Sequence, residues 1–331
     1  MTNTREYRRN MMRSQFQCWL RILCLACLGL LPSQATATLS IVTSLPEYEA
    51  LAKEIVGWCS PLCAESDEIT ITSLGRGTED LHFVNPKPSY IRILNNADVL
   101  IQNGAGVDEG WLPPLIAASR NPKLVLSFDS PTRIMAAQFV DMLQLPSTQI
   151  DRSMGDIHLL GHPHFHLSPT NAILIAKGLT EKFCFLQPDS CSRFTRNLNT
   201  FEKRIEKKLP IWQKQMKPLR NVNVIEYHQT FAYLAKSFGL GLVGDELEPK
   251  PGIPPSAAHI RKLIPRMNAM DVKLLLIEPF HERKTPTFIA QQTKAKVVII
   301  PSTIGGVPGT DDYISLIDTI VSRLVLAYAS H

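Results

Sequence analysis

The feature that most constrains the fold is a regular alternation of short apolar segments with amphipathic helical segments. In the first part of the chain, strand-like segments cover residues 39–45, 68–74, 98–103 and 123–127. Helix-like segments separate them at residues 47–56, 89–96 and 108–118. Strands that alternate with helices of this length are typical of a parallel sheet with right-handed crossover connections. The sequence therefore predicts a first α/β lobe in residues 38–188.

The same alternation returns in the last third of the chain. Strand-like segments cover residues 221–227, 240–245, 274–277 and 296–301. Helix-like segments cover residues 231–238, 256–268, 286–293 and 311–329, and Ser256 is a suitable cap for the second of them. We therefore predict a second α/β lobe in residues 219–331. In both lobes we expect a mostly parallel sheet flanked by helices.

Between the two lobes, residues 189–218 are predicted to form one long charged helix. Apolar side chains recur on one face of it at helical spacing: Phe194, Leu198, Phe201, Ile205 and Leu209. A helix of this length can run across both lobes and link them. An ordinary surface helix has the same periodicity, so the pattern alone leaves both arrangements open.

The first 37 residues are typical of a signal peptide. A basic start is followed by the uncharged, mostly apolar residues 22–32 and by Ala35-Thr36-Ala37, the small residues expected before a cleavage site. The apolar run is too short to span a bilayer comfortably, so we expect export and cleavage rather than a membrane anchor. A lipid anchor at Cys27 is a weaker alternative, because Cys24 stands where such signals usually have an aliphatic residue.

Export decides how the remaining cysteines and charges are interpreted. In an oxidising compartment the four cysteines after residue 37 favour two local disulfides, Cys59–Cys63 and Cys184–Cys191. Crossed pairing stays open, whereas a four-thiolate zinc site usually has closer Cys-x2-Cys pairs. The leader carries five arginines and one glutamate, so its removal lowers the net charge from +5 to about +1. This balance gives no support for nucleic-acid binding.

Histidines supply the candidate functional residues. Four of the nine lie within residues 155–169, and His164 among them precedes a predicted helix. His82 and His228 each follow a predicted strand and precede a helix. Ligands of α/β sheets bind beyond the carboxyl ends of the strands, so the three imidazoles could converge on a cleft between the lobes as metal ligands. A single histidine in such a place more often caps a helix or forms a hydrogen bond.

Motifs around these histidines resemble those of a known family. Residues 81–89 (LHFVNPKPS) are similar to a Pro-His-x-Tyr-x-Pro-x-Pro-Ser motif, and residues 162–171 (HPHFHLSPTN) to an Asn/Asp-Pro-His-x-Trp-Leu-Asp-Pro-x-Asn motif. Residues 227–240 and Glu278-Pro279 follow in the same order. The chain thus resembles the cluster A-I solute-binding proteins of metal-importing ABC transporters over nearly its whole mature length. The resemblance implies His82, His164 and His228 as metal ligands.

The departures from these motifs concern the surroundings of the ligands. Leu81 replaces a proline, His166 a tryptophan and Ser168 an aspartate. The family often takes a fourth ligand from an aspartate after the last strand, but residues 301–306 (PSTIGG) contain no carboxylate. A water, Glu278, Asp311 or Asp312 could take that position, and the two aspartates could equally cap a helix before Tyr313. We expect His158, His162 and His281 to be neighbours of the ligands or surface residues.

The resemblance implies a periplasmic receptor that binds a divalent metal ion between its lobes and delivers it to an ABC permease in the inner membrane. Three nitrogen ligands favour Zn2+, whereas the manganese receptors of this family resemble a set with two histidines and two carboxylates. We expect a monomer without catalytic activity, and Mn2+ is the alternative ion. The rival function is an exported zinc hydrolase with Glu278 as general base, although the sequence has no His-Glu-x-x-His motif and no nucleophile elbow.

Overall fold

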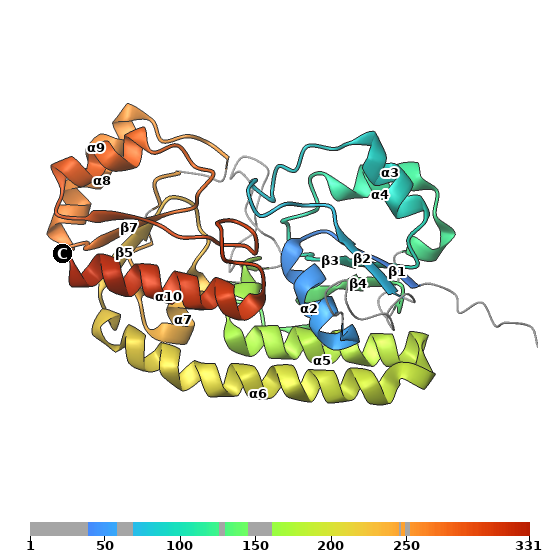
Figure 1. Cartoon of the computed structure of the whole chain (residues 1–331). Helices are drawn as coiled ribbons and strands as arrows, with labels where there is room; N and C mark the ends of the chain where they lie inside the picture. Colours follow the sequence, from blue (N-terminus) through green and yellow to red (C-terminus); the bar gives the residue numbers. More distant parts are fainter. Residues whose placement is uncertain (1–38, 58–68, 126–129, 145–160, 245, 249–251) are drawn as a thin grey trace, which may run out of the picture. The chain divides into compact units, whose positions relative to one another are not determined.

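The computed structural model describes residues 39–57, 69–125, 130–144, 161–244, 246–248 and 252–331 (Figure 1). The predicted signal peptide at residues 1–37, the predicted Cys59–Cys63 disulfide and His158 lie outside these residues. Within them, none of the helices is both long enough and apolar enough to cross a membrane.

The first lobe contains a four-stranded sheet in which all neighbouring strands are parallel. Its strands are β1 (Leu39–Thr43), β2 (Ile69–Ser73), β3 (Val99–Gln102) and β4 (Arg133–Met135), in the order β2-β1-β3-β4. The helices α2 (Pro46–Val56), α3 (Pro88–Asn95) and α4 (Leu112–Ser119) connect them. Every residue of β3 is buried, as expected for a central strand covered on both faces.

Two predictions in this lobe were wrong in position. Of the strand expected at residues 123–127, Lys123 and Leu124 lie in a 3-10 turn, η1 (Pro122–Leu124), and residues 126–127 lie outside the described residues. Asn121 caps this turn by accepting the N–H of Lys123. The fourth strand is β4, which lies ten residues further on. The helix expected from Asp108 begins at Leu112, because the Asp108 carboxylate accepts the N–H groups of Asn103 and Gly104 in a tight turn.

The second lobe repeats the architecture. Its strands are β5 (Asn223–Glu226), β6 (Gly241–Leu242), β7 (Leu274–Ile277) and β8 (Lys296–Ile299), in the parallel order β6-β5-β7-β8. Its helices are α7 (Ala232–Phe238), α8 (Ala257–Ala269), α9 (Lys284–Gln292) and α10 (Tyr313–Ala329). Ser256 caps α8 by accepting the N–H of His259, as predicted. The two parallel sheets confirm the predicted two-lobe α/β fold.

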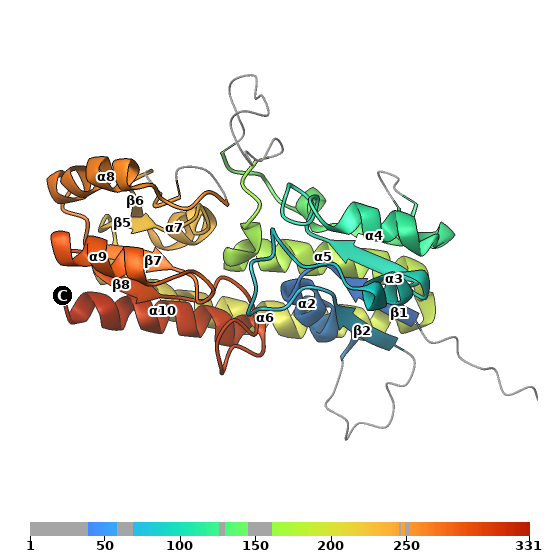
Figure 2. The same ribbon diagram turned by 90° about the horizontal axis from the view of Figure 1, so that it is seen from above.

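The long charged helix is also confirmed, as α6 (Cys191–Met216). It contacts α2 and α5 (Pro169–Leu186) along its first part and α7 and α10 further along, so it touches elements of both lobes (Figures 1 and 2). Its predicted apolar stripe is buried at Phe194, Leu198, Phe201 and Ile205 and continues to Trp212 and Met216. Pro210 lies inside the helix and removes one backbone donor there.

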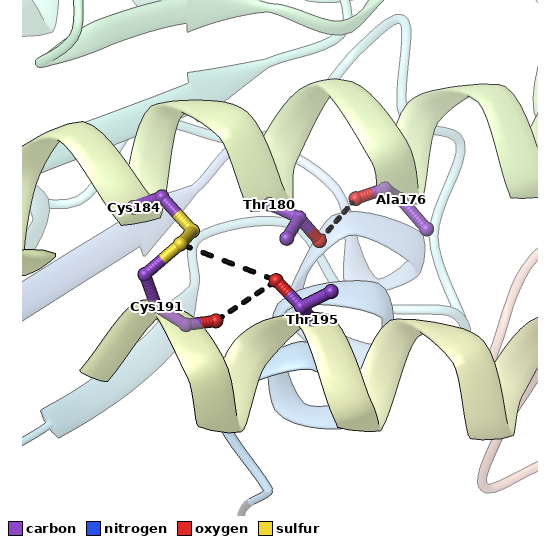
Figure 3. The surroundings of a disulfide bond; sticks show 5 residues. All are labelled: Ala176, Thr180, Cys184, Cys191 and Thr195. Atoms are coloured by element: carbon purple, nitrogen blue, oxygen red, sulfur yellow. Dashed lines mark hydrogen bonds between the residues drawn. A yellow bond between two sulfur atoms is a disulfide. The ribbon is translucent and has the colours of Figure 1, made fainter.

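A disulfide joins Cys184 near the end of α5 to Cys191 at the start of α6 (Figure 3). It confirms one of the two predicted local pairs. On the same turn, the hydroxyl of Thr195 donates to the carbonyl oxygen of Cys191. The bridge therefore fixes the turn that makes α5 and α6 antiparallel neighbours.

Replacing both Cys184 and Cys191 with serine is expected to lower the free energy of unfolding by about 2 kcal/mol, the loop-closure entropy of so short a loop. The two cysteines are only seven positions apart, which places the effect at the low end for disulfides. Urea unfolding of the double variant beside the oxidised wild type measures this difference. An unchanged unfolding midpoint would show that the bridge adds nothing beyond the packing of α5 on α6.

Candidate metal centre

A small cavity lies where the carboxyl ends of the strands of both lobes face each other. First-lobe residues on its wall come from the loops after β2 and β3 and from the segment before α5, and second-lobe residues from the loops after β5, β7 and β8. Its volume is about 20 Å³, which is room for roughly one water-sized species. The residues that line it are Glu79, Asp80, Leu81, His82, Val107, His164, His166, His228, Glu278, Phe280, His281, Ser302 and Thr303.

The three histidines singled out from the sequence meet in this cavity. His82 and His164 come from the first lobe and His228 from the second, and all three are buried. One ligand atom from each lies within 4.8 Å of the other two. The Nε2 atoms of His82 and His164 are 3.2 Å apart. Two nitrogens of a tetrahedral zinc site are about 3.3 Å apart when each Zn–N bond is about 2.0–2.1 Å, so this pair has the spacing of two zinc ligands.

Glu248 orients the third imidazole. Its Oε2 lies 2.9 Å from Nδ1 of His228. A carboxylate only accepts hydrogen bonds, so Nδ1 of His228 carries the proton of this bond. Nε2 of His228 is buried and has no hydrogen-bond partner in the described part of the chain. In metal sites, a histidine usually binds the metal through one ring nitrogen and donates the other N–H to a carboxylate, which fixes the orientation of the ring. His228 and Glu248 have this arrangement.

Burial and charge act differently on the imidazoles of the two lobes. Burial, together with the neighbouring His82, His162 and His228, holds the pKa of His164 well below its usual value. Burial also acts to lower the pKa of His228, but the bond to Glu248 and the nearby carboxylates outweigh it and raise that pKa to about 8. In the metal-free protein the imidazole of His164 is therefore neutral at pH 7, whereas the imidazole of His228 is mostly protonated and positively charged.

Three acidic residues line the cavity, namely Glu79, Asp80 and Glu278. Glu278 is buried, and one of its oxygens accepts the hydroxyl of Thr230. Its other oxygen, Oε2, approaches Nε2 of His281 to 3.2 Å, while the His281 ring stacks on Tyr227. Burial raises the pKa of Asp80, although its carboxylate accepts the N–H of His82. Glu278 is thus the carboxylate among the fourth-ligand candidates that reaches the cavity.

Asp311 and Asp312, the other carboxylates considered for the fourth position, lie elsewhere. Both line a separate groove with α2 and α6 residues, including Lys53 and Asn197. Asp312 is the N-cap of α10: its side chain accepts the N–H of Ser315, whose hydroxyl in turn bonds back to the Asp312 backbone. The structure therefore gives Asp312 the helix-capping role that the sequence left open.

Two further histidines support the ligand segment. His162 is buried, with its ring against those of His164 and Tyr233, and its Nδ1 accepts the backbone N–H of His164. His166 is buried on the cavity wall, where its Nε2 lies 2.9 Å from the carbonyl oxygen of Ser302. Both are neighbours of His164, as expected for His162. Glu248 was missed, because nothing in the sequence links it to a histidine twenty residues earlier.

The chain is similar in sequence to known proteins. A family model described as "ZnuA: Zinc-uptake complex component A periplasmic" matches residues 41–327. The "High-affinity zinc uptake system protein ZnuA" of Bacillus subtilis (strain 168) is 23% identical over 269 residues, which cover 78% of this chain and 76% of that protein.

Solved structures show the same fold. The crystal structure of ZnuA superposes with a TM-score of 0.70 at 23% identity and covers 88% of this chain and 99% of its own. The solute-binding protein FpvC from Pseudomonas aeruginosa, in complex with Mn2+, has a TM-score of 0.72 at 21% identity and covers 88% and 99% of the two chains.

Proposed function

The chain belongs to the family of periplasmic zinc-uptake components, and we propose that as a monomer it captures one Zn2+ ion between its lobes and delivers it to an ABC permease in the inner membrane. One observation carries the proposal. Three buried imidazoles from both lobes converge on a cavity that has room for about one water-sized species. The proposal includes removal of residues 1–37 on export, which the intact mass of the mature protein would reveal.

The proposed ligands are His82, His164 and His228, each through a ring nitrogen that faces the cavity. The fourth position is assigned to a water held by Oε2 of Glu278. This carboxylate lines the cavity, but its oxygens are not part of the group of ligand atoms within 4.8 Å of one another. Three nitrogens and one oxygen complete the tetrahedral coordination that zinc prefers.

The donor set supports zinc over manganese. Imidazole nitrogens suit Zn2+, whereas Mn2+ prefers carboxylate and carbonyl oxygens. Manganese stays the alternative ion for two reasons. A protein of the same fold has been solved with Mn2+. In addition, the carboxylates of Glu278 and Asp80 line the same cavity as the imidazoles.

The size of the cavity argues for a receptor rather than a hydrolase. Three histidines and a water also form catalytic zinc sites, in which Glu278 would serve as general base. A hydrolase has to bring a substrate bond to its metal-bound water. Here the three histidines are each less than a tenth exposed and the cavity has room for about one water-sized species, which favours a bound ion over a larger substrate.

Metal content tests the proposal directly. Native mass spectrometry of the purified mature protein is expected to show one zinc per chain, and competition with Mn2+ is expected to leave zinc bound. A strain that lacks the gene should grow poorly when zinc is chelated and recover with the wild-type gene. Failure of the wild-type protein to take up zinc would refute the proposal, and displacement of zinc by equimolar Mn2+ would identify manganese as the cargo.

Glu248 gives a graded test, because it acts on the metal only through His228. Replacing Glu248 with glutamine is expected to weaken zinc binding about 10- to 100-fold, as is usual when the partner behind a metal-binding histidine is lost. Competition with a chromogenic chelator measures the change. Glu246→Gln is the matched control, since the Glu246 carboxylate bonds Gln229 instead. Equal affinities of the two variants would mean that Glu248 does not support a metal ligand.

A further inference from the structure

Residues 302–306, here named the closing loop, follow β8 in the second lobe. Ser302 and Thr303 of this loop line the metal cavity. The family that the chain resembles often has a metal-binding aspartate after the last strand, but residues 301–306 contain no carboxylate. Instead, three separate segments of the first lobe hold the closing loop in place.

The first contact is made by His166, just after the ligand His164. Nε2 of His166 lies 2.9 Å from the carbonyl oxygen of Ser302. A carbonyl oxygen only accepts, so Nε2 of His166 is the donor. The backbone carbonyl of His166 in turn accepts the hydroxyl of Tyr313, at the start of α10, at 2.7 Å. His166 is thus bonded to two second-lobe residues, and it is buried.

The second contact is made by Glu47 in the first turn of α2. Its side chain is completely buried, and Oε1 accepts the backbone N–H of Ile304 at 3.1 Å. The same oxygen lies 4.0 Å from Nε2 of His166. A buried carboxylate has a large desolvation cost, which a bond from a backbone N–H partly offsets. Separation of the two lobes would remove that bond.

The third contact is between backbones. A Cβ atom placed on Gly77 would lie 2.0 Å from the carbonyl oxygen of Ile304 and 2.5 Å from backbone atoms of Gly305 and Gly306. Gly77 has no positive φ angle, so its backbone alone would accept alanine. The close approach of the closing loop is what requires glycine here.

We propose that Glu47 and His166 are positioning residues that hold the closing loop against the first lobe and so slow the escape of the bound metal. The inference rests on the proposed function. Two ligands, His82 and His164, belong to the first lobe, and His228 belongs to the second. Any separation of the lobes therefore lengthens the bond to His228 first. Contacts that oppose the separation lower the rate of metal release without touching the ion.

The decisive variant is Gly77→Ala, which places a methyl group against the closing loop. The protein is loaded with one zinc, mixed with excess chelator in a stopped-flow instrument, and the rate of release is recorded. Release from Gly77→Ala is expected to be at least about tenfold faster than from the wild type, since a clash of this size forces the loop away. Gly110→Ala is the control, because the nearest atom to its new Cβ is 3.8 Å away, and its release rate should stay unchanged.

Conservative variants separate positioning from general destabilisation. Glu47→Gln keeps an oxygen that accepts the Ile304 N–H and should release zinc nearly as slowly as the wild type, whereas Glu47→Ala should be about tenfold faster. His166→Gln keeps a donor for Ser302, and His166→Phe removes it, so the same order is expected. The rate of zinc binding should change much less than the rate of release in each pair.

The outcomes are distinguishable. A wild-type protein that takes up no zinc overturns both the proposed function and this inference. One zinc per chain in the wild type, with equal release rates for Gly77→Ala and Gly110→Ala, overturns the inference alone. Equal rates for Glu47→Ala and Glu47→Gln likewise remove Glu47 from the mechanism. Circular dichroism of each loaded variant shows whether it is folded when its rate is measured.

Discussion

Replacing His228 with alanine is expected to lower the affinity for zinc by at least about a thousandfold. This is more than the effect of losing a residue that only hydrogen-bonds a metal ligand, such as Glu248. His228 is the single proposed ligand from the second lobe, so its loss removes one of three metal–nitrogen bonds and also the connection that the metal makes between the lobes. His82→Ala and His164→Ala are expected to have effects of the same size. Competition with chelators of graded affinity measures each dissociation constant.

His259→Ala is the matched control for these variants. Its imidazole bonds the backbone carbonyl of Glu246 outside the cavity, so zinc affinity should remain within about twofold of the wild type. Thermal unfolding of the metal-free proteins should show that all four variants are folded. A His228→Ala protein that keeps wild-type affinity would exclude His228 as a ligand.

Zinc affinity is expected to rise with pH by up to about tenfold per unit from mildly acidic conditions to about pH 8, and then to level off. In the metal-free protein the pKa of His228 is raised to about 8, so below that pH zinc has to displace a proton. The pKa of His164 is lowered well below its usual value, so His164 needs no deprotonation in this range. Dissociation constants measured at constant ionic strength from pH 6 to 9 test the slope.

The variant Glu248→Gln supplies the internal check on this pH dependence. The bond to Glu248 raises the pKa of His228, and removing its charge lets burial lower that pKa. The variant should therefore reach its plateau at a lower pH than the wild type, although its affinity at the plateau is weaker. A wild-type affinity that does not change between pH 6 and 8 would contradict the proton displacement.

Most of the fold could be predicted because the local pattern and the tertiary structure agree. The segment at residues 274–277 is four apolar residues between turn signals, and it forms β7 at the predicted position. β4 could not be predicted, since it has three residues and only Ile134 among them is buried. Three residues are too few to show a period of two. Lys123 and its neighbours have strand-like composition, but Pro122 and the cap at Asn121 start a turn there.

The residues of the candidate site also fall into those that could be predicted from the sequence and those that could not. His82, His164 and His228 could be singled out because each has the same local context, after a strand or in a loop that enters a helix. Glu47 and Glu248 could not. Glu47 reads as an ordinary acidic residue in the first turn of a helix, and only the tertiary structure brings Ile304, more than 250 positions later, to its carboxylate. A contact of that kind leaves no trace in local spacing.

The helix α6 sets the mechanical character of the receptor. At about 1.5 Å per residue it is roughly 39 Å long, and it packs against helices of both lobes. Beyond Pro210, Trp212 bonds Asp318 of α10, which fixes this end of α6 to the second lobe. Because Pro210 has no N–H group, one turn of α6 lacks a backbone hydrogen bond. We expect α6 to bend more easily at this turn than elsewhere along its length. Lys208, one turn before Trp212, bonds the same Asp318, so both sides of the proline are fixed to α10 and a bend of this turn stays within the second lobe.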